Sequence, residues 1–353
     1  MQDQRRKTPT RGRGALENPV NRFEKIDLEY EADAELADRL PTEVFKDTSR
    51  SVISYNDSPD VGMEATLNAY RGCEHGCIYC FARPFHEYLG LSSGLDFETK
   101  IFAKVDAPEL LRKTLSSKKW EPKVVTMSGI TDPYQPLERK LQITRRCLEI
   151  FNEFNNPVSI ITKNYLVTRD IDIYSEMAKK NLIRINFSIT TLNKNTARVM
   201  EPRACAPHQR LKAVKQLTDA GIPVNVMMAP IVPGLTDHEI PKLLEAVANA
   251  GAGTAAYVML RLPYAVKDMF ETWLGEHFPL RKDKVLNRLR SMRDGKLYSS
   301  EWGTRMTGKG FYTEQIEALF YASRKRYGLD KKYPSLTTEN FRNAADKQMK
   351  LFD

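Results

Sequence analysis

Three cysteines lie within eight residues of one another, close enough in sequence for their sulfurs to share one metal centre. Cys73, Cys77 and Cys80 have the spacing C-x3-C-x2-C in the segment RGCEHGCIYC at 71–80. Thiolates are soft ligands that bind zinc, copper(I) or iron–sulfur clusters. Gly72 and Gly76 permit the tight backbone turns that bring the three sulfurs together. A [4Fe–4S] cluster held by three cysteines leaves one iron open for a further ligand, as a catalytic cluster requires. The spacing therefore favours a catalytic cluster.

A zinc site is the alternative for this loop. Structural zinc usually has four protein ligands, often in two separated pairs, whereas Cys147 and Cys205 lie far from the triplet in the sequence. His75 or His86 would have to complete such a site. Five cysteines is also an odd number, which argues against a secreted disulfide framework and predicts a reducing, cytoplasmic location.

The composition sets outer limits on the class of protein. With 353 residues and 41% hydrophobic residues, the chain can bury a sizeable core, which excludes disorder of the whole chain. No apolar run approaches the ~18–20 residues of a membrane span, so no membrane association is expected. The first residues, MQDQRRK, have no apolar stretch behind them and so do not form a secretory signal. The sequence does not indicate an oligomeric state.

The positive charge is concentrated at the two ends of the chain. The formal net charge is +9, of which residues 1–20 carry +3 and residues 281–353 carry +8, so the 260 residues between carry −2. Residues 1–20 combine Pro, Gly and Arg without an apolar period and are predicted to be a disordered basic arm. Basic ends of this kind suit contact with DNA or RNA phosphates, although a solubilising tail explains the arm as well.

Short apolar runs alternate with amphipathic segments through the middle of the chain, at a spacing typical of βαβ units. The predicted strands are Ala65–Tyr70, Val124–Ser128, Val158–Thr162, Ile183–Ile189, Val224–Met228 and Ala256–Leu260. The predicted helices are Ala107–Ser117, Ile143–Phe154, Ile171–Lys180, Pro207–Ala220 and Asp237–Ala250. Six such units build a doubly wound sheet or a curved, barrel-like sheet. In both, functional residues gather in the loops that follow the carboxyl ends of the strands.

The cysteine loop, with an aromatic residue before its last cysteine and a place on the first loop of a repeated β/α chain, resembles that of the radical S-adenosylmethionine (SAM) superfamily. The resemblance implies a partial (β/α)6 TIM-type barrel in which Cys73, Cys77 and Cys80 hold a [4Fe–4S] cluster. It also implies that SAM chelates the open iron and is cleaved by an electron from the cluster, giving a 5′-deoxyadenosyl radical that abstracts hydrogen from a substrate. A reductant such as flavodoxin or ferredoxin is implied as partner. Tyr79 matches the family's aromatic near the adenine, with ordinary packing as the alternative.

The other strand ends carry polar groups that match a narrower branch, the relatives of spore photoproduct lyase. A hydroxyl and a carboxylate after the second strand suit an ammonium group, a Lys after the third suits the methionine carboxylate, and a Ser ends the fourth. The loop after the fifth strand resembles the family's adenine-contacting stretch. The resemblance implies SAM contacts from Tyr79, Thr131, Asp132, Lys163, Ser188 and Ile231. A simple helix cap is the alternative for Asp132.

The similarity to an uncharacterised bacterial subfamily of that branch covers almost the whole chain. It includes RGRGALENPVNRFE, GLDFETKI, TDPYQPLER, MEPRA, APIVPGLTD and SEWGTRMTGKG. One position departs from the lyase pattern, because Ile130 stands where the lyase has a hydrogen-donating cysteine. Reversal of thymine dimers is therefore not expected, and no catalytic side chain is assigned. Cys205 is a candidate redox residue, against an incidental loop thiol, and Cys147 is expected in the core.

Four further residues are candidate contacts to a ligand, and for three of them a structural role is the alternative. Arg83 and His86 follow the cysteine loop and would contact phosphate or substrate, with a structural role for His86 as the alternative. Arg203 and Arg261 follow the fourth and sixth strands and would hold an anion at the open end, with a structural ion pair as the alternative.

The chain is expected to divide into a disordered basic arm at 1–20, an N-terminal extension at 21–60, the radical SAM barrel at 61–262, a helical extension at 263–330 and a polar tail at 331–353. The leading hypothesis is a radical SAM enzyme that abstracts hydrogen from a substrate the sequence does not name, with nucleic acid as the favoured substrate class. Modification of a protein, peptide or small metabolite is the alternative within enzymes. A zinc-stabilised nucleic-acid-binding module without catalysis is the alternative of another class.

Overall fold

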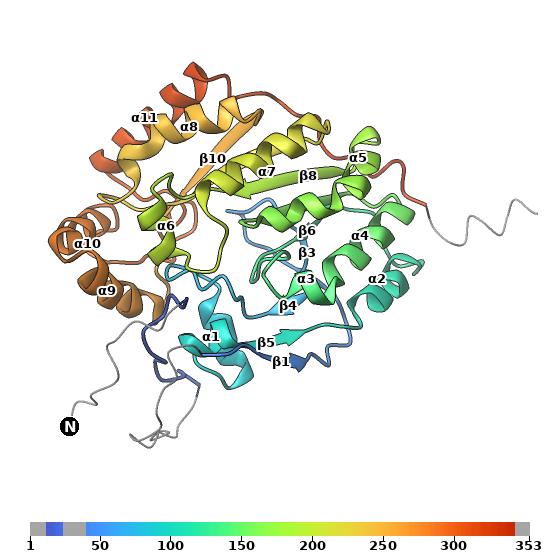
Figure 1. Cartoon of the computed structure of the whole chain (residues 1–353), viewed down its shortest axis with the longest axis horizontal. Coiled ribbons are helices and arrows are strands. Elements are labelled where there is room, and N and C mark those ends of the chain that lie inside the picture. Colours follow the sequence, from blue (N-terminus) through green and yellow to red (C-terminus); the bar gives the residue numbers. More distant parts are fainter. Residues whose placement is uncertain (1–11, 24–39, 343–353) are drawn as a thin grey trace, which may run out of the picture.

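The computed structural model describes residues 12–23 and 40–342, and its centre is one curved sheet of seven strands (Figure 1). The strand order is β10-β9-β8-β7-β6-β3-β2. All pairs are parallel except that β2 runs antiparallel to β3 at one edge. The bounds are β2 Ile53–Tyr55, β3 Ala65–Leu67, β6 Val125–Met127, β7 Val158–Thr162, β8 Ile183–Ser188, β9 Val224–Ile231 and β10 Thr254–Met259. The predicted partial (β/α)6 barrel is confirmed.

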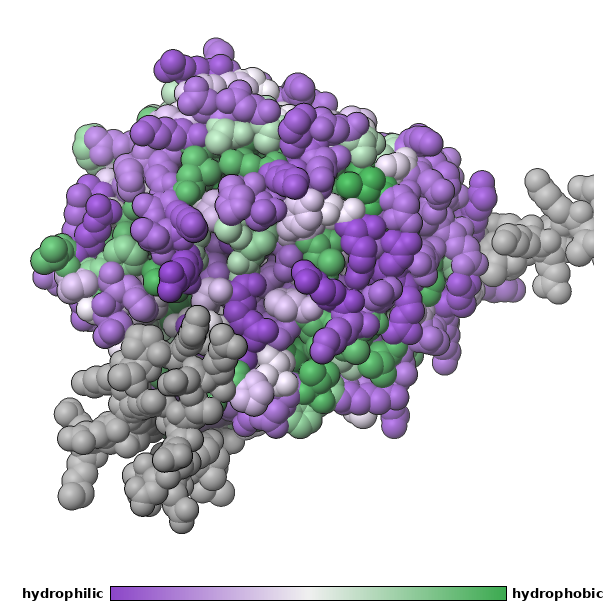
Figure 2. Space-filling model, in the orientation of Figure 1, coloured by the Kyte–Doolittle hydropathy of each residue, from purple (hydrophilic) through white to green (hydrophobic). Residues whose placement is uncertain are grey.

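Amphipathic helices cover the outside of the sheet (Figure 1). Each predicted helix is present: α2 Ala107–Leu115, α4 Ile143–Glu153, α5 Ile171–Lys179, α7 Pro207–Asp219 and α8 Ile240–Asn249. Their apolar faces and the strands form one continuous hydrophobic core, and Cys147 lies in it as expected. Hydrophilic side chains dominate the face seen in Figure 2, as expected for the outer sides of such helices. No helix in the described ranges is long and apolar enough to cross a membrane.

The first predicted strand is divided into two strands that belong to different sheets. After β3 the chain leaves the barrel, and β4 (Tyr70–Arg71) pairs antiparallel with β5 (Lys100–Ala103). β5 in turn pairs parallel with β1 (Glu43–Lys46), which completes a small three-stranded sheet beside the barrel. The cysteine loop begins where β4 ends. The small sheet therefore holds the start of the cysteine loop, which has left the barrel sheet at that point.

The C-terminal extension is helical, as predicted, with α9 Val266–His277, α10 Lys282–Ser291 and α11 Phe311–Arg326. The segment before α11 spans the open side of the barrel. At one end, Met259 at the end of β10 donates its N–H to the Met306 carbonyl at 2.8 Å. At the other end, the Gly303 N–H donates to the Asp60 carboxylate at 2.7 Å, and Arg305 pairs with the same carboxylate. This segment therefore links the last strand to the turn between β2 and β3.

Two predicted boundaries are wrong in the parts that the structure describes. Residues 1–11 of the predicted arm lie outside the described residues, but Arg13 and Ala15 are 7% and 0% exposed. Both residues are hydrogen-bonded to Glu98: the Arg13 guanidinium donates to its backbone carbonyl at 2.8 Å, and the Ala15 N–H donates to its carboxylate at 2.8 Å. At the other end, residues 331–342 pack under the barrel, where the Arg342 N–H donates to the Phe154 carbonyl at 2.8 Å. Residues 24–39 of the N-terminal extension and 343–353 of the tail lie outside the described residues.

Candidate active site

The cysteine loop lies at the carboxyl ends of the strands and is held from two sides. The Cys73 N–H donates to the Phe97 carbonyl at 2.9 Å, which ties the start of the loop to helix α1 (Leu95–Thr99). The Ile78 N–H donates to the Met200 carbonyl at 3.1 Å, which ties its middle to helix α6 (Lys194–Met200). The structure thus places the loop between the small sheet and the loop region after β8.

Two of the three cysteines, Cys73 and Cys77, are buried, Cys80 is partly buried, and the thiols are close enough to interact electrostatically. Burial raises the pKa of Cys73 and Cys80, and it raises that of Cys77 to about 12. Each thiolate charge disfavours the others, since Cys77 and Cys80 both raise the pKa of Cys73. A metal centre reverses this balance, because thiolates bound to metal are deprotonated. The soft donor set on one loop fits a [4Fe–4S] cluster, in which separate thiolates bind separate irons.

The two histidines near the loop differ, since both ring nitrogens of His75 have partners, whereas the His86 Nε2 atom is buried without a hydrogen-bond partner in the described residues. The His75 ring contacts the Asp132 carboxylate through Nδ1 at 3.3 Å and the Asn164 amide through Nε2 at 3.1 Å. His86 is buried edge-on against Phe97, with ring centroids 5.7 Å apart, and burial lowers its pKa to about 4. Within residues 12–23 and 40–342, no three His, Cys, Asp or Glu side chains surround a point where one metal ion would bind.

A buried ion pair supports the loop from below. Arg83 and Glu98 are both fully buried and lie 2.5 Å apart. The Glu98 carboxylate also accepts hydrogen bonds from the N–H groups of Gly14 and Ala15, at 2.9 and 2.8 Å. The Arg83 guanidinium donates in addition to the Cys77 carbonyl at 3.0 Å. The N-terminal segment therefore helps to hold the cysteine loop in place, and these hydrogen bonds explain why the segment is buried.

The prediction that Arg83 contacts substrate is wrong. Besides Cys77 and Glu98, its guanidinium donates to the carbonyls of Ser93 and Gly94, at 3.2 and 2.9 Å. These bonds leave the side chain no reach toward a ligand. Sequence reasoning assigned no role to Glu98, and the only signal was its place in the subfamily motif GLDFETKI.

Gly76 is the position in the loop least able to accept a side chain. Its φ is +64°, and an added Cβ would lie 2.6 Å from the Glu98 Oε2 atom. That oxygen cannot easily move, because the Gly14 N–H binds it and the whole side chain is buried. Glycine is thus required at position 76 by the positive backbone φ and by the close approach of the Glu98 carboxylate.

We expect Gly76→Ala to destabilise the loop more than Gly90→Ala does. Both glycines have positive φ, +64° and +72°, so alanine costs roughly 1–2 kcal/mol at either position. Only Gly76 adds a steric clash, which costs about 1–3 kcal/mol more, because no atom lies within 4 Å of an added Cβ at Gly90. Urea unfolding of both variants measures the difference, and equal losses would contradict the assigned role of the Glu98 contact.

Thr131 and Asp132, predicted to contact SAM, make several bonds within the protein. Thr131 donates its hydroxyl to the Gly72 carbonyl at 2.7 Å. The Asp132 carboxylate accepts from the Thr162 hydroxyl at 2.8 Å and the Lys163 N–H at 2.9 Å. Although burial opposes it, the pKa of Asp132 is lowered, chiefly by His75. These residues join the cysteine loop to the ends of β6 and β7, and their contact with SAM stays a prediction.

Tyr79 and Ser188 are connected through a second buried ion pair. The Tyr79 hydroxyl donates to the Glu201 carboxylate, which pairs with Arg210 at 2.5 Å. Arg210 also donates to the Ser188 carbonyl at 3.2 Å, and the Lys163 ammonium lies 5.9 Å from the centre of the Tyr79 ring. Three of the predicted SAM residues therefore lie around one network. Glu201 and Arg210 were missed; the only signal for Glu201 was the motif MEPRA, and Arg210, in helix α7, carried none.

Ile231 ends β9 and is fully buried in the hydrophobic core. Ile130 packs partly buried against the small cluster formed by Cys73, Ala82 and Phe97. The Cys205 thiol lies beside the end of β7, donating to the Lys163 carbonyl at 3.0 Å and accepting from the Tyr165 N–H at 3.2 Å. Ile130 thus lies near the cysteine loop, and Cys205 lies near the predicted SAM residue Lys163.

The two arginines with open assignments have different environments. Arg203 pairs with Glu74 at 2.9 Å, as the structural alternative predicted. Arg261 lies with its guanidinium 5.7 Å from the centre of the Phe81 ring. Its Nε atom is buried without a hydrogen-bond partner in the described parts of the chain. Because Phe81 directly follows Cys80 and is 46% exposed, Arg261 is the arginine placed to meet an anion near the cysteine loop.

Comparisons with known proteins identify the family. The model of the radical SAM superfamily matches residues 67–247, just over half of the chain. An uncharacterized protein of Mycobacterium tuberculosis is 33% identical over 229 residues, which span 64% of this chain and 66% of that protein, just under two thirds of its length. A protein of Pseudomonas phage M6, "Radical SAM Nalpha-GlyT isomerase", is 25% identical over 51% of this chain and 35% of its own length.

Among solved structures, spore photoproduct lyase complexed with dinucleoside spore photoproduct has a similar fold. It superposes with a TM-score of 0.56 and 15% identity, over 80% of this chain and 79% of the lyase chain. The shared architecture, the matching family model and the cysteine loop agree. The chain belongs to the radical SAM superfamily, whose enzymes use a [4Fe–4S] cluster and SAM.

Proposed function

We propose that this enzyme binds its [4Fe–4S] cluster through Cys73, Cys77 and Cys80 and acts on nucleic acid. The observation that carries the proposal is the set of three neighbouring thiols, two buried and one partly buried, on one loop at the carboxyl ends of the strands. When bound, the cluster and SAM supply the reductive cleavage and hydrogen abstraction of the family. A reductant such as flavodoxin or ferredoxin completes the proposed reaction. Family membership replaces the alternative of a non-catalytic zinc module.

The residues around the loop suit the two ends of SAM. The Lys163 ammonium makes no ion pair within the described residues, so it is available to the methionine carboxylate. Tyr79 is held in place by Glu201 and Arg210, and we assign its ring to the adenine side. Thr131, Asp132 and Ser188 hold the strand ends in position around this space. Ile231 is assigned a backbone contact only, because its side chain is fully buried.

Three observations support nucleic acid as the substrate class. The solved lyase of similar fold is complexed with a dinucleoside spore photoproduct. The barrel is close to neutral while the ends are basic. Arg261 and Phe81 present a guanidinium and an exposed ring near the loop, which suit a phosphate and a base. Since Ile130 has no S–H group, we do not propose repair of thymine dimers. Protein, peptide and metabolite substrates are the alternative.

The substrate class is tested by binding and by isotope transfer. We expect the reconstituted enzyme to bind oligonucleotides with an affinity that falls steeply with salt, because each phosphate contact releases counterions. Incubation with SAM and deuterated oligonucleotide is expected to transfer deuterium into 5′-deoxyadenosine. Anisotropy titrations over a salt series and mass spectrometry measure the two effects. Deuterium transfer from a labelled peptide or metabolite, and none from oligonucleotides, would instead support the alternative substrates.

A further inference from the structure

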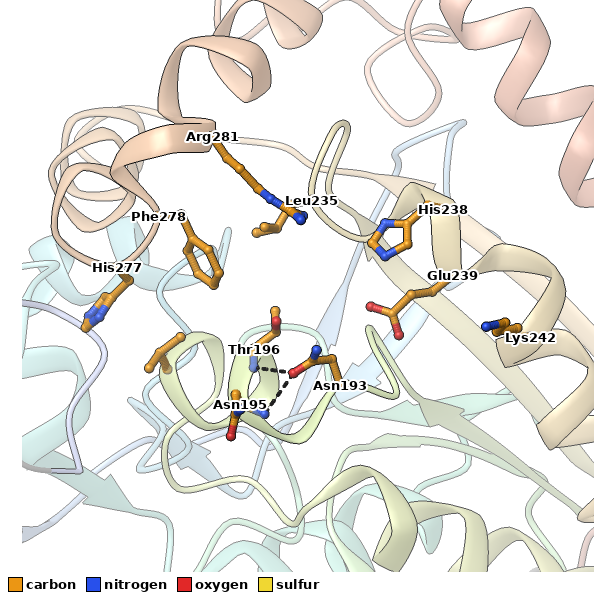
Figure 3. A pocket seen from close by; sticks show the side chains of 11 residues that line it. Asn193, Asn195, Thr196, Leu235, His238, Glu239, Lys242, His277, Phe278 and Arg281 are labelled. Carbon is orange, nitrogen blue, oxygen red and sulfur yellow. Dashed lines mark hydrogen bonds between the residues drawn. The ribbon is translucent and has the colours of Figure 1, made fainter.

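A basic groove lies between the barrel and the C-terminal extension, separate from the cysteine loop. It encloses about 650 Å³. Its walls come from α6, from the loop after β9 that leads into α8, and from the end of α9 with the turn that follows (Figure 3). A volume of this size accommodates a nucleotide-sized group. Its lining includes Asn193, Val199, His238, Glu239, Lys242 and Arg281.

The basic side chains of this groove are not neutralised by the protein. The side chains of Arg281 and Lys242 make no ion pair or hydrogen bond within residues 12–23 and 40–342. The acidic residue Glu239 is already engaged, since it accepts hydrogen bonds from the Thr191 hydroxyl at 2.5 Å and the Leu192 N–H at 2.7 Å. Figure 3 shows Arg281 reaching from the extension toward the loop that carries Leu235 and His238. The groove therefore presents an excess of positive charge to a ligand.

One amide in the groove is also oriented toward a ligand. The Asn193 Oδ1 atom accepts the N–H groups of Asn195 and Thr196, at 2.9 and 3.0 Å, and so caps α6 (Figure 3). This fixes the side chain and leaves its NH2 group free to donate. A donor fixed by a cap, opposite unpaired cations, suits phosphate oxygens.

The positive charge continues along α10 beyond the groove. A second hollow shares His238 and Arg281 with the groove and extends to Lys284 and Arg288. Arg281, Lys284 and Arg288 are spaced by three and four residues, which places them on one face of the helix. Arg288 is partly neutralised by Asp237 at 3.1 Å, whereas Lys284 makes no ion pair in the described chain. An extended row of cations matches a polyanion better than a single phosphate group.

The groove and the cysteine loop share one helix as a wall. Val199 of α6 lines the groove, and its carbonyl accepts the Trp273 indole N–H of α9 at 3.2 Å. The next residue, Met200, accepts the Ile78 N–H of the cysteine loop. A strand bound in the groove would therefore pass along the rim on which the cysteine loop lies. In Figure 1, α6 accordingly lies between the α9–α10 pair and the strands.

We infer that this groove and its continuation along α10 bind the phosphate backbone of a nucleic-acid strand whose reacting nucleoside enters the barrel at the cysteine loop. The inference rests on the proposed nucleic-acid substrate. It assigns the binding charge to Arg281, Lys284 and Lys242. It leaves out Arg293, which is 3% exposed and donates to the Leu260 carbonyl at 2.7 Å.

The test is charge reversal in the groove against the same reversal on the opposite rim. The groove variant is Arg281→Glu with Lys284→Glu, and the control is Lys118→Glu with Lys119→Glu, two exposed residues at the other end of the barrel. With the reconstituted full-length protein and a single-stranded oligonucleotide, we expect the groove variant to lose at least about tenfold in affinity. Its slope of log K against log salt should fall by about 1.4, since each lost contact removes about 0.7. The control variant should keep the slope of the unaltered protein.

Each outcome has one meaning. Equal affinity and slope in the two variants overturn the groove assignment, provided that the unaltered protein binds the oligonucleotide. If the unaltered protein binds no oligonucleotide, the proposed substrate class itself is wrong. A parallel titration with ATP distinguishes a small phosphorylated ligand: loss of ATP binding with unchanged oligonucleotide binding overturns the assignment to a strand. Iron content and thermal denaturation verify that both variants fold and load alike.

Discussion

Replacing Cys73, Cys77 or Cys80 with alanine is expected to abolish cluster binding and SAM cleavage. The three sulfurs are the only soft donors on the loop, so each substitution removes one of three ligands. Anaerobic reconstitution of the unaltered protein should give about four iron and four sulfide per chain. Each variant should fall to near zero in both and should form no 5′-deoxyadenosine from SAM above background. Iron and sulfide assays, visible absorbance and chromatography of the products measure these effects.

Cys147→Ala is the matched control for these variants. Cys147 lies on the buried face of α4 in the main core, and its thiol contacts no part of the loop in the described structure. The Cys147→Ala variant should therefore keep its cluster and its SAM cleavage activity. A Cys73→Ala protein with full cleavage activity would contradict the ligand assignment. Zinc at one equivalent per chain without sulfide would instead revive the zinc alternative.

Removing the buried Glu98 carboxylate is expected to cost about 3–5 kcal/mol of the free energy of unfolding. Glu98→Ala leaves the Arg83 guanidinium uncompensated at 0% exposure and removes the acceptor of the Gly14 and Ala15 N–H groups. The variant should therefore be less stable, and its N-terminal segment should detach from the cysteine loop. Urea unfolding measures the first effect, and faster proteolysis between residues 12 and 23 measures the second.

The control for Glu98→Ala is an ion pair of the same type on the surface. Arg112 and Glu153 lie 2.6 Å apart with about half of each side chain exposed, at 49% and 46%. Arg112→Ala should cost less than about 1 kcal/mol, because exposed pairs contribute little. If Glu98→Ala cost no more than Arg112→Ala, the buried pair would not be the foundation of the loop.

The features predicted correctly from the sequence are those encoded by neighbouring residues. The alternation of apolar runs and amphipathic segments predicted the strands and helices of the barrel, because each pattern repeats within a few residues. The spacing of Cys73, Cys77 and Cys80 predicted the kind of metal centre, because one short loop holds all three. The first strand was the exception, since its division between two sheets depends on pairing with β5, some thirty residues later.

The composition of the basic C-terminal extension does not indicate which of its arginines can bind a ligand. The sequence contains Arg281, Arg288 and Arg293 within thirteen residues, and their types give no reason to distinguish them. In the folded chain Arg293 is buried, Arg288 is paired with Asp237, and the Arg281 side chain faces the groove with no partner among the described residues. Charge at a surface depends on which acidic groups and carbonyls the fold brings near, and that is a property of packing.

The sequence by itself determined the family, the fold class and the three candidate cluster ligands, because each depends on spacing along the chain. Only the tertiary structure decided what supports them. Glu98 meets Gly14 across 84 residues, and Tyr79 meets Glu201 across 122. Such contacts form where distant segments bury polar groups together, and a buried charge must find its partner wherever the fold supplies one. Local patterns carry no record of that partner, which is why the foundation of the loop appeared only in the folded protein.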